Sequence, residues 1–105
     1  NNTILAIREE LKAMVSSNAV IQQILTHDVL RGEDLKRIRE ELGVSLEILT
    51  EMTKIRTIFL RAIEDKEYEK APFGMFLKSY VKAYAQSIGL DADFVASRYL
   101  KGMND

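Results

Sequence analysis

The chain contains no cysteine, one proline and one histidine among its 105 residues. The absence of cysteine excludes a disulfide framework and thiol catalysis, and it fits a reducing compartment. No apolar run approaches the roughly 18 residues that a membrane-spanning helix needs, so we expect no membrane contact by this segment. Net charge is also scarce, and at −1 the chain has no overall attraction for nucleic acid. The length suits one small domain with a single core.

Residue types that support catalysis or metal binding are equally sparse. His27 has no companions at metal-ligand spacing, so we predict no metal site. The glycines are isolated, which excludes a glycine-rich phosphate-binding loop. Adjacent carboxylates such as Glu40 and Glu41 have basic neighbours on a predicted helix, which is the pattern of a solvated face. We therefore expect no enzyme, no catalytic residue and no cofactor.

The charges that are present divide unevenly along the chain. Residues 33–53 contain six acidic and three basic side chains, a net charge of −3. Residues 54–82 contain seven basic and four acidic side chains, a net charge of +3. The molecule is therefore predicted to be dipolar, unless these charges are simply scattered over a solvated surface.

Residues 1–31 are predicted to form a hairpin of two helices ahead of the main domain. The first helix has an apolar stripe at helical spacing. The segment Ser16-Ser17-Asn18 breaks it and offers caps for a second helix, which we expect to end near Leu30. The stripes of the two helices are Ile4, Ile7, Leu11, Met14 and Val15, followed by Val20, Ile21, Ile24 and Leu25.

Residues 32–105 are predicted to form the main domain, with five helices. The first stops at Gly43, which suits a left-handed C-cap, and Ser45 caps the second. The third and fourth are expected to span about Arg56–Asp65 and Phe73–Ile88. A charged connector, a proline, a glycine and a capping aspartate mark the remaining boundaries: Lys66–Ala71, Pro72, Gly89 and Asp91.

The second and third of these helices have the layout of a helix-turn-helix. Residues 45–64 read SLEILTEMTKIRTIFLRAIE, two short apolar-periodic segments with a joint between them. Thr50 is small enough for two helices to cross closely. Lys54 occupies the turn position that favours a left-handed backbone, where a glycine is usual. We expect five side chains to be buried together beneath this unit: Leu46, Leu49, Ile55, Leu60 and Ile63.

The order of motifs from Gly32 to Leu100 resembles one known family. The segments TKIR and AIED, followed by YEKAPFGMFLKSYVKAYAQSIGLDADFVASRYL, are similar to the cytoplasmic helix-turn-helix domain of the RodZ family of bacterial cell-shape proteins. The resemblance implies an all-α fold, in which a five-helix, repressor-like core follows the N-terminal two-helix hairpin. It also implies a cytoplasmic location, with a membrane anchor beyond Asp105.

The first functional hypothesis is docking of a protein partner. Phe76 and Tyr80 lie four residues apart and would form an aromatic ridge beside the buried stripe of their helix, with Lys78 and Lys82 on the other flank. The RodZ resemblance implies that this helix binds an actin-like filament protein, MreB. The alternative is that Phe76 packs against the last helix or the N-terminal hairpin.

The second hypothesis is DNA binding through the helix that follows the turn. Its outward residues are expected to be Thr57, Ile58 and Arg61, while Lys54 and Arg56 could hold phosphates at its start. Only Arg61 has the forked donors that base contacts favour, and it could instead pair with a nearby carboxylate. A third possibility is self-association through the N-terminal hairpin.

Overall fold

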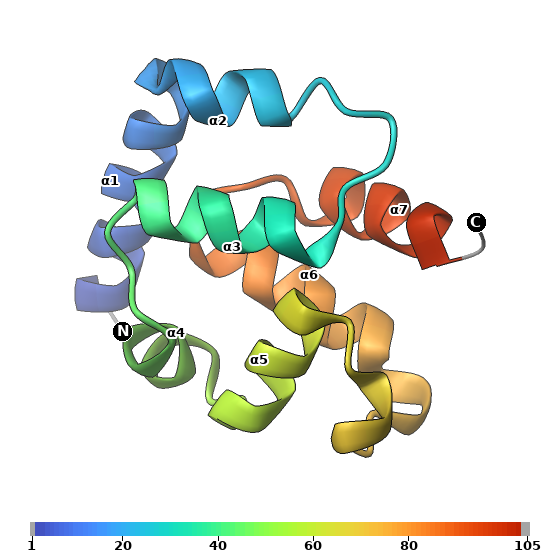
Figure 1. The fold of residues 1–105 in the computed structure, drawn as a ribbon. Coiled ribbons are helices and arrows are strands. Elements are labelled where there is room, and N and C mark those ends of the chain that lie inside the picture. The colour runs from blue at the N-terminus through green and yellow to red at the C-terminus, as the bar shows by residue number, and fades with distance from the viewer. Residues whose placement is uncertain (1, 104–105) are drawn as a thin grey trace.

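The computed structural model describes residues 2–103, and every regular element in this range is helical (Figure 1). The described residues include no helix that is both long and apolar enough to cross a membrane. The predicted all-α fold is confirmed. Its elements are α1 (Asn2–Ser17), α2 (Ala19–Ile24), α3 (Gly32–Glu41), α4 (Leu46–Thr53), α5 (Thr57–Asp65), the 3₁₀ turns η1 (Tyr68–Lys70) and η2 (Gly74–Phe76), α6 (Leu77–Ser87) and α7 (Ala92–Met103).

The five helices α3 to α7 surround a core, and α1 and α2 precede them along the chain. Helix α6 packs on α7, α3 packs on α5, and α2 lies against α3. In Figure 1, α2 lies at one end of the molecule, and α4 and α5 lie at the other. Buried apolar side chains from all seven of these helices belong to one continuous cluster. The division into residues 1–31 and 32–105 stays a prediction.

Local signals set several helix ends as predicted. The Asn18 side chain accepts a hydrogen bond from the Ile21 amide at 2.9 Å and begins α2. Ser45 accepts from the Ile48 amide at 3.1 Å and begins α4. Asp91 accepts from the Phe94 amide at 2.9 Å and begins α7. Each of these side chains satisfies an amide that has no partner within its own helix.

Helix α2 is shorter than predicted, because it ends at Ile24 and not near Leu30. Residues 25–31 instead connect α2 to α3 without regular structure (Figure 1). Two hydrogen bonds attach this connection to α7. Arg98 donates to the His27 carbonyl at 3.1 Å, and the Leu30 amide donates to the Arg98 carbonyl at 3.3 Å. These bonds replace helical ones, and they let Leu30 reach the core. His27, predicted on a helix, therefore lies on this connection.

Helix α6 begins at Leu77, four residues later than predicted. Gly74 has φ of +55°, a left-handed conformation that interrupts the helix expected to start after Pro72. Phe73 turns into the core, where it is 5% exposed. The segment between α5 and α6 is therefore an ordered connection, with η1 and η2 in place of a longer α6.

Helix α1 contributes less to the core than its five-residue stripe predicted. Leu11 and Val15 are buried, but Ile7 and Met14 are about 40% exposed (39% and 43%). The helix meets the rest of the chain mainly through its second half, at the joint between α6 and α7. A Cβ atom on Gly89 in this joint would lie 2.7 Å from the Lys12 amide nitrogen, so only glycine allows this approach.

Candidate functional site

The turn between α4 and α5 has the geometry that the sequence predicted. Lys54 has φ of 60° and ψ of 21°, and its amide donates to the Thr50 carbonyl at 2.8 Å. The Thr53 hydroxyl donates to the Leu49 carbonyl at 2.8 Å and accepts from the Ile55 amide at 3.1 Å. These bonds close the end of α4 and direct the chain into α5, although the left-handed lysine costs about 1–2 kcal/mol.

The two helices of this unit are held together by the predicted core. Thr50 lies at the crossing, and its hydroxyl is 2.9 Å from the Thr57 hydroxyl. The small side chain therefore makes a polar contact as well as a close approach. The five residues expected to be buried together are each at most 9% exposed: Leu46, Leu49, Ile55, Leu60 and Ile63.

The residues predicted to contact DNA do gather around the start of α5. Lys54, Arg56 and Arg61 are exposed, and Ile58 is 51% exposed. Thr57 is half-buried, and its hydroxyl is already bonded to Thr50. This cluster thus offers cations and one apolar side chain, but few groups with base-reading geometry.

Arg61 does not pair with Glu64 or Asp65, as the sequence had left open. Within residues 2–103 its guanidinium makes no hydrogen bond and no ion pair, whereas Glu64 is turned into the core. Glu51 on α4 lines the same shallow hollow as Lys54 and Arg56. Its carboxylate would oppose a phosphate placed there.

An aromatic cluster joins α5 to the start of α6. The Phe59 ring lies edge-on to Phe73 and to Tyr80, with ring centroids 5.2 Å apart in both pairs. Tyr80 is also stacked against Phe76, with centroids 6.2 Å apart and planes inclined by 19°. The predicted ridge of Phe76 and Tyr80 therefore exists, and Phe59 and Phe73 support it from beneath.

The two ridge residues differ in exposure. Phe76 is 54% exposed, and neighbouring Met75 is 85% exposed. Tyr80 is half-buried against Phe59 and Phe73. Phe76 therefore does not pack inside the molecule, which was the alternative. Leu77 on the same helix is partly buried and packs against the core.

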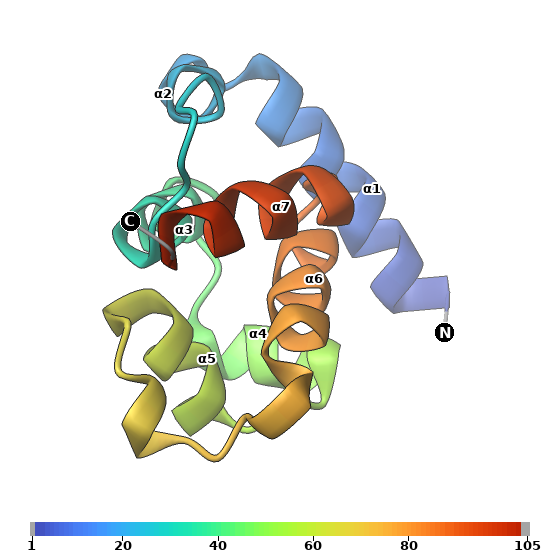
Figure 2. The ribbon, with the colours of Figure 1, turned by 90° about the vertical axis from the view of Figure 1, so that its right-hand side faces the viewer.

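The N-terminal helices leave this ridge uncovered. Figure 2 shows α1 crossing near the end of α6 that leads into α7. Phe76 and Tyr80 belong to the opposite end, where α6 begins at Leu77. Gly89, which contacts α1, lies just beyond the end of α6, so the 11 residues of α6, about 16 Å of helix, separate it from Phe76.

The flanking lysines are only partly available. Lys82 forms an ion pair with Asp93 of α7 at 2.9 Å. A hydrogen bond from Lys82, followed by its charge and that of Lys78, lowers the pKa of Asp93. Lys78 is exposed and makes no ion pair of its own within residues 2–103. Lys78 is thus the freer cation beside the ridge.

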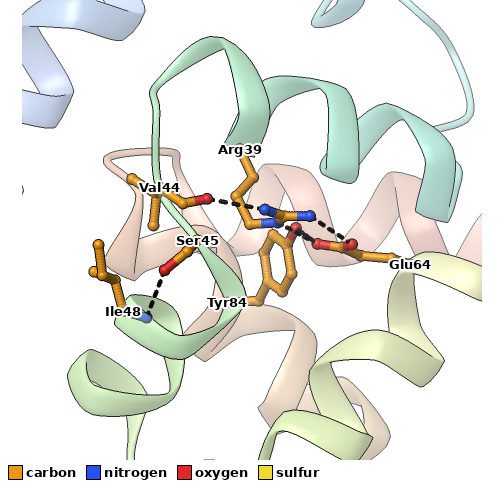
Figure 3. Close-up of polar contacts among 6 residues, drawn as sticks. All are labelled: Arg39, Val44, Ser45, Ile48, Glu64 and Tyr84. Atoms are coloured by element: carbon orange, nitrogen blue, oxygen red, sulfur yellow. Dashed lines mark hydrogen bonds and ion pairs between the residues drawn. The ribbon is translucent and has the colours of Figure 1, made fainter.

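A buried polar network beneath this surface was missed in the sequence (Figure 3). Arg39 of α3 donates to both carboxylate oxygens of Glu64 on α5, at 2.6 and 3.0 Å, and to the Val44 carbonyl at 2.9 Å. The Tyr84 hydroxyl of α6 donates to the same carboxylate. Three helices therefore meet at one buried carboxylate. Gly32 permits this, because a Cβ there would lie 2.2 Å from the Glu64 carbonyl oxygen.

The network is electrostatically satisfied. Hydrogen bonds from Arg39 to Glu64 raise the pKa of that guanidinium above its ordinary value. Burial, followed by the charge of Glu64, raises the pKa of Tyr84 well above its ordinary value. Both groups therefore stay protonated at neutral pH, and each nitrogen of the Arg39 guanidinium has an acceptor. Its role is to fix α3, α5 and α6 relative to one another.

Comparisons with known proteins agree with this geometry. The family model described as "Helix-turn-helix domain" matches residues 34–95. The chain is 34% identical over 58 residues to the "Uncharacterized membrane protein YmfM" of Bacillus subtilis (strain 168), covering 55% of this chain and 20% of that protein. It is 32% identical over 71 residues to the "Cytoskeleton protein RodZ" of Streptococcus pneumoniae (strain ATCC BAA-255 / R6), covering 68% of this chain and 26% of that protein.

The chain thus spans only about a fifth to a quarter of the length of these curated relatives. No solved structure matches it. The family match covers more than half of the chain, and it includes α4, the turn at Lys54 and α5. The chain therefore belongs to the helix-turn-helix domain family, and its helix-turn-helix domain is RodZ-like.

Proposed function

We propose that this domain is a non-enzymatic binding module that docks a protein partner through a patch formed by Met75, Phe76 and Tyr80, the docking patch. The observation that carries the proposal is that Phe76, at the start of α6, is 54% exposed. Large exposed apolar groups on an otherwise well-packed domain are typical of interaction sites. Aromatic side chains are also common among the residues that dominate binding energy.

The surroundings of Phe76 suit a docking role. The stack on Tyr80 limits its motion, and Phe59 and Phe73 hold Tyr80 from the core side. A ring held in place before binding loses little conformational entropy when a partner covers it. Lys78 adds a positive charge beside the patch, which favours a partner surface that is apolar and acidic.

The proposed partner is an actin-like filament protein of the MreB type. Support for this choice comes from the RodZ resemblance and from the word "Cytoskeleton" in the name of a relative. We also propose a cytoplasmic location as part of a membrane-anchored protein. A second relative is named a membrane protein, and that description supports the anchor.

The proposal is tested by co-sedimentation of the domain with filaments of the MreB-like protein from the same genome. Phe76→Ala is expected to weaken binding by at least about 2 kcal/mol, because a docking aromatic acts as a hot spot. Its melting temperature should stay nearly unchanged, because most of the ring is already in solvent. Tyr80→Ala should lower both binding and stability, since Tyr80 also packs on Phe59 and Phe73.

A matched control is Phe94→Ala on α7. Phe94 is a partly exposed phenylalanine, 36% exposed, and it lies under the Arg98 guanidinium away from the ridge. This variant should bind filaments like the wild type. Unchanged binding by Phe76→Ala, or an equal loss in Phe94→Ala, would reject the docking patch.

DNA binding by α5 is the alternative, and the left-handed turn at Lys54 followed by exposed Arg61 favours it. A DNA reader should bind duplex with an affinity that falls steeply with salt. Arg61→Ala should then cost about 1–3 kcal/mol at one sequence. Because the net charge is −1 and Glu51 lies beside the cations, we expect weak, sequence-independent binding at most. A sequence-specific footprint lost in Arg61→Ala would reverse this ranking.

A further inference from the structure

A second candidate surface lies between α5 and the turn η1. Ile58, Arg61 and Ala62 share one face of α5, at positions i, i+3 and i+4. With Glu67 and Lys70 they line a hollow of about 140 Å³. Ile58 is 51% exposed and forms an apolar wall of the hollow, whereas Ala62 is buried beneath it.

The size of this hollow restricts what it can hold. Pockets that take small molecules or cofactors usually measure about 300–1,000 Å³. A hollow of about 140 Å³ is better suited to one side chain of a macromolecule. Its apolar lining favours an aliphatic side chain such as leucine, because burying such a group removes apolar area from water.

The charges around the hollow indicate which charged group of the partner should lie beside the aliphatic side chain. Lys70 is paired with Glu67 at 2.6 Å, so these two charges compensate each other. Arg61 makes no ion pair within residues 2–103. It is therefore the uncompensated cation at the rim. Its planar guanidinium can take a carboxylate with two parallel hydrogen bonds.

The same features disfavour a nucleic acid in this place. A hollow with an apolar lining offers no donor and acceptor pattern for a base edge.

We propose that this hollow, the α5 pocket, binds a protein segment in which an aliphatic side chain is followed by a carboxylate. The aliphatic side chain packs against Ile58 in the hollow, and the carboxylate pairs with Arg61. This site is separate from the docking patch, which consists of other side chains and would contact its partner through the Phe76 ring. In this chain the helix that contacts DNA in other helix-turn-helix proteins thus presents a peptide pocket.

The test uses two synthetic probes, acetyl-Gly-Leu-Asp-Gly-amide and acetyl-Gly-Leu-Lys-Gly-amide. Each is titrated into the full chain while amide nuclear magnetic resonance shifts are followed. The aspartate peptide should give saturable shifts at Ile58, Ala62 and Lys70 in the millimolar range. The lysine peptide should bind about three- to fivefold more weakly, which is the size expected for an exposed ion pair.

Two variants make the outcome decisive. Arg61→Ala should bind both peptides equally, and Ile58→Ala should weaken both, with unchanged melting temperatures because both side chains are exposed. Phe76→Ala should bind the peptides like the wild type, so failure of the docking patch and failure of the α5 pocket are distinguishable. Absence of saturable shifts, or equal binding of the two peptides by the wild type, would overturn the proposal. So would displacement of the aspartate peptide by a duplex DNA.

Discussion

The ion pair of Arg39 and Glu64 should behave differently when one partner or both are replaced. Glu64→Leu leaves a buried guanidinium without its carboxylate, and it should lower the free energy of unfolding by about 3–5 kcal/mol. The double variant Arg39→Met with Glu64→Leu should lose less than that single variant, because no buried charge remains. Urea denaturation of the wild type, Arg39→Met, Glu64→Leu and the double variant measures this coupling.

The exposed pair of Arg37 and Glu41, at 3.3 Å, is the control for this cycle. It also joins an arginine of α3 to a glutamate, but the Arg37 side chain is 57% exposed, so its coupling should not exceed about 0.5 kcal/mol. Additive losses at Arg39 and Glu64 would show that the buried pair is not a unit.

Tyr84 predicts how stability changes in alkali. Its ordinary pKa is 10.0, and burial beside Glu64 raises the pKa in the folded state. Below the pKa that Tyr84 has in the unfolded chain, its contribution to the free energy of unfolding is therefore fully present. As pH rises above that value the unfolded chain loses a proton that the folded chain keeps, so the stability falls by about 1.4 kcal/mol per pH unit.

Tyr84→Phe isolates this contribution in denaturation curves measured across that range. At neutral pH it should cost about 1.5–3 kcal/mol, because a hydrogen bond to a charged acceptor is lost. Above the ordinary tyrosine pKa its stability should fall less steeply than that of the wild type. Parallel slopes for the two proteins would contradict the assignment.

The sequence does not reveal this network, because charged side chains are exposed by default. Arg39 and Glu64 are 25 residues apart, and each has nearer partners of opposite charge along its own helix. Only the close approach of α3 and α5 at Gly32 brings them together. The aromatic ridge was predictable because Phe76 and Tyr80 are four residues apart, and helical spacing is a local property.

At the scale of elements, the turn before α5 offers a direct test of backbone strain. Lys54→Gly should raise the free energy of unfolding by about 1 kcal/mol, because glycine adopts the left-handed conformation without steric cost. The reverse change, Gly43→Ala, should lower it, since Gly43 has φ of +71°. Thermal or urea unfolding measures both. A destabilised Lys54→Gly would mean that the lysine stem contributes packing that glycine removes.

Helix ends were predictable where one side chain decides them, as at Ser45 and Asp91. They were not predictable where a distant contact decides. Helix α2 stops at Ile24, and His27 and Leu30 bond to α7 instead of continuing it; nothing within residues 19–31 indicates that partner. The late start of α6 follows from the burial of Phe73, which depends on Phe59 and Tyr80.

At the scale of the whole molecule, the continuous core predicts that the described residues unfold as one unit. Ile21 of α2 and Leu60 of α5 are both fully buried. Ile21→Ala and Leu60→Ala should each cost about 2–5 kcal/mol and keep a single unfolding transition. If residues 1–31 were an independent domain, Ile21→Ala would leave the main transition in place and separate a second, earlier one. Calorimetry with circular dichroism distinguishes these outcomes.

The meeting of Arg39, Glu64 and Tyr84 also constrains how such a sequence can diverge. If Arg39 is replaced first, the intermediate protein has an unpaired buried carboxylate and loses about 3–5 kcal/mol. That is a large share of the roughly 5–15 kcal/mol by which natural domains are stable. Simultaneous replacement of Arg39 and Glu64 avoids that intermediate, but it requires two substitutions to occur together. Positions 39 and 64 should therefore change together among related chains or not at all, while Arg37 and Glu41 drift independently.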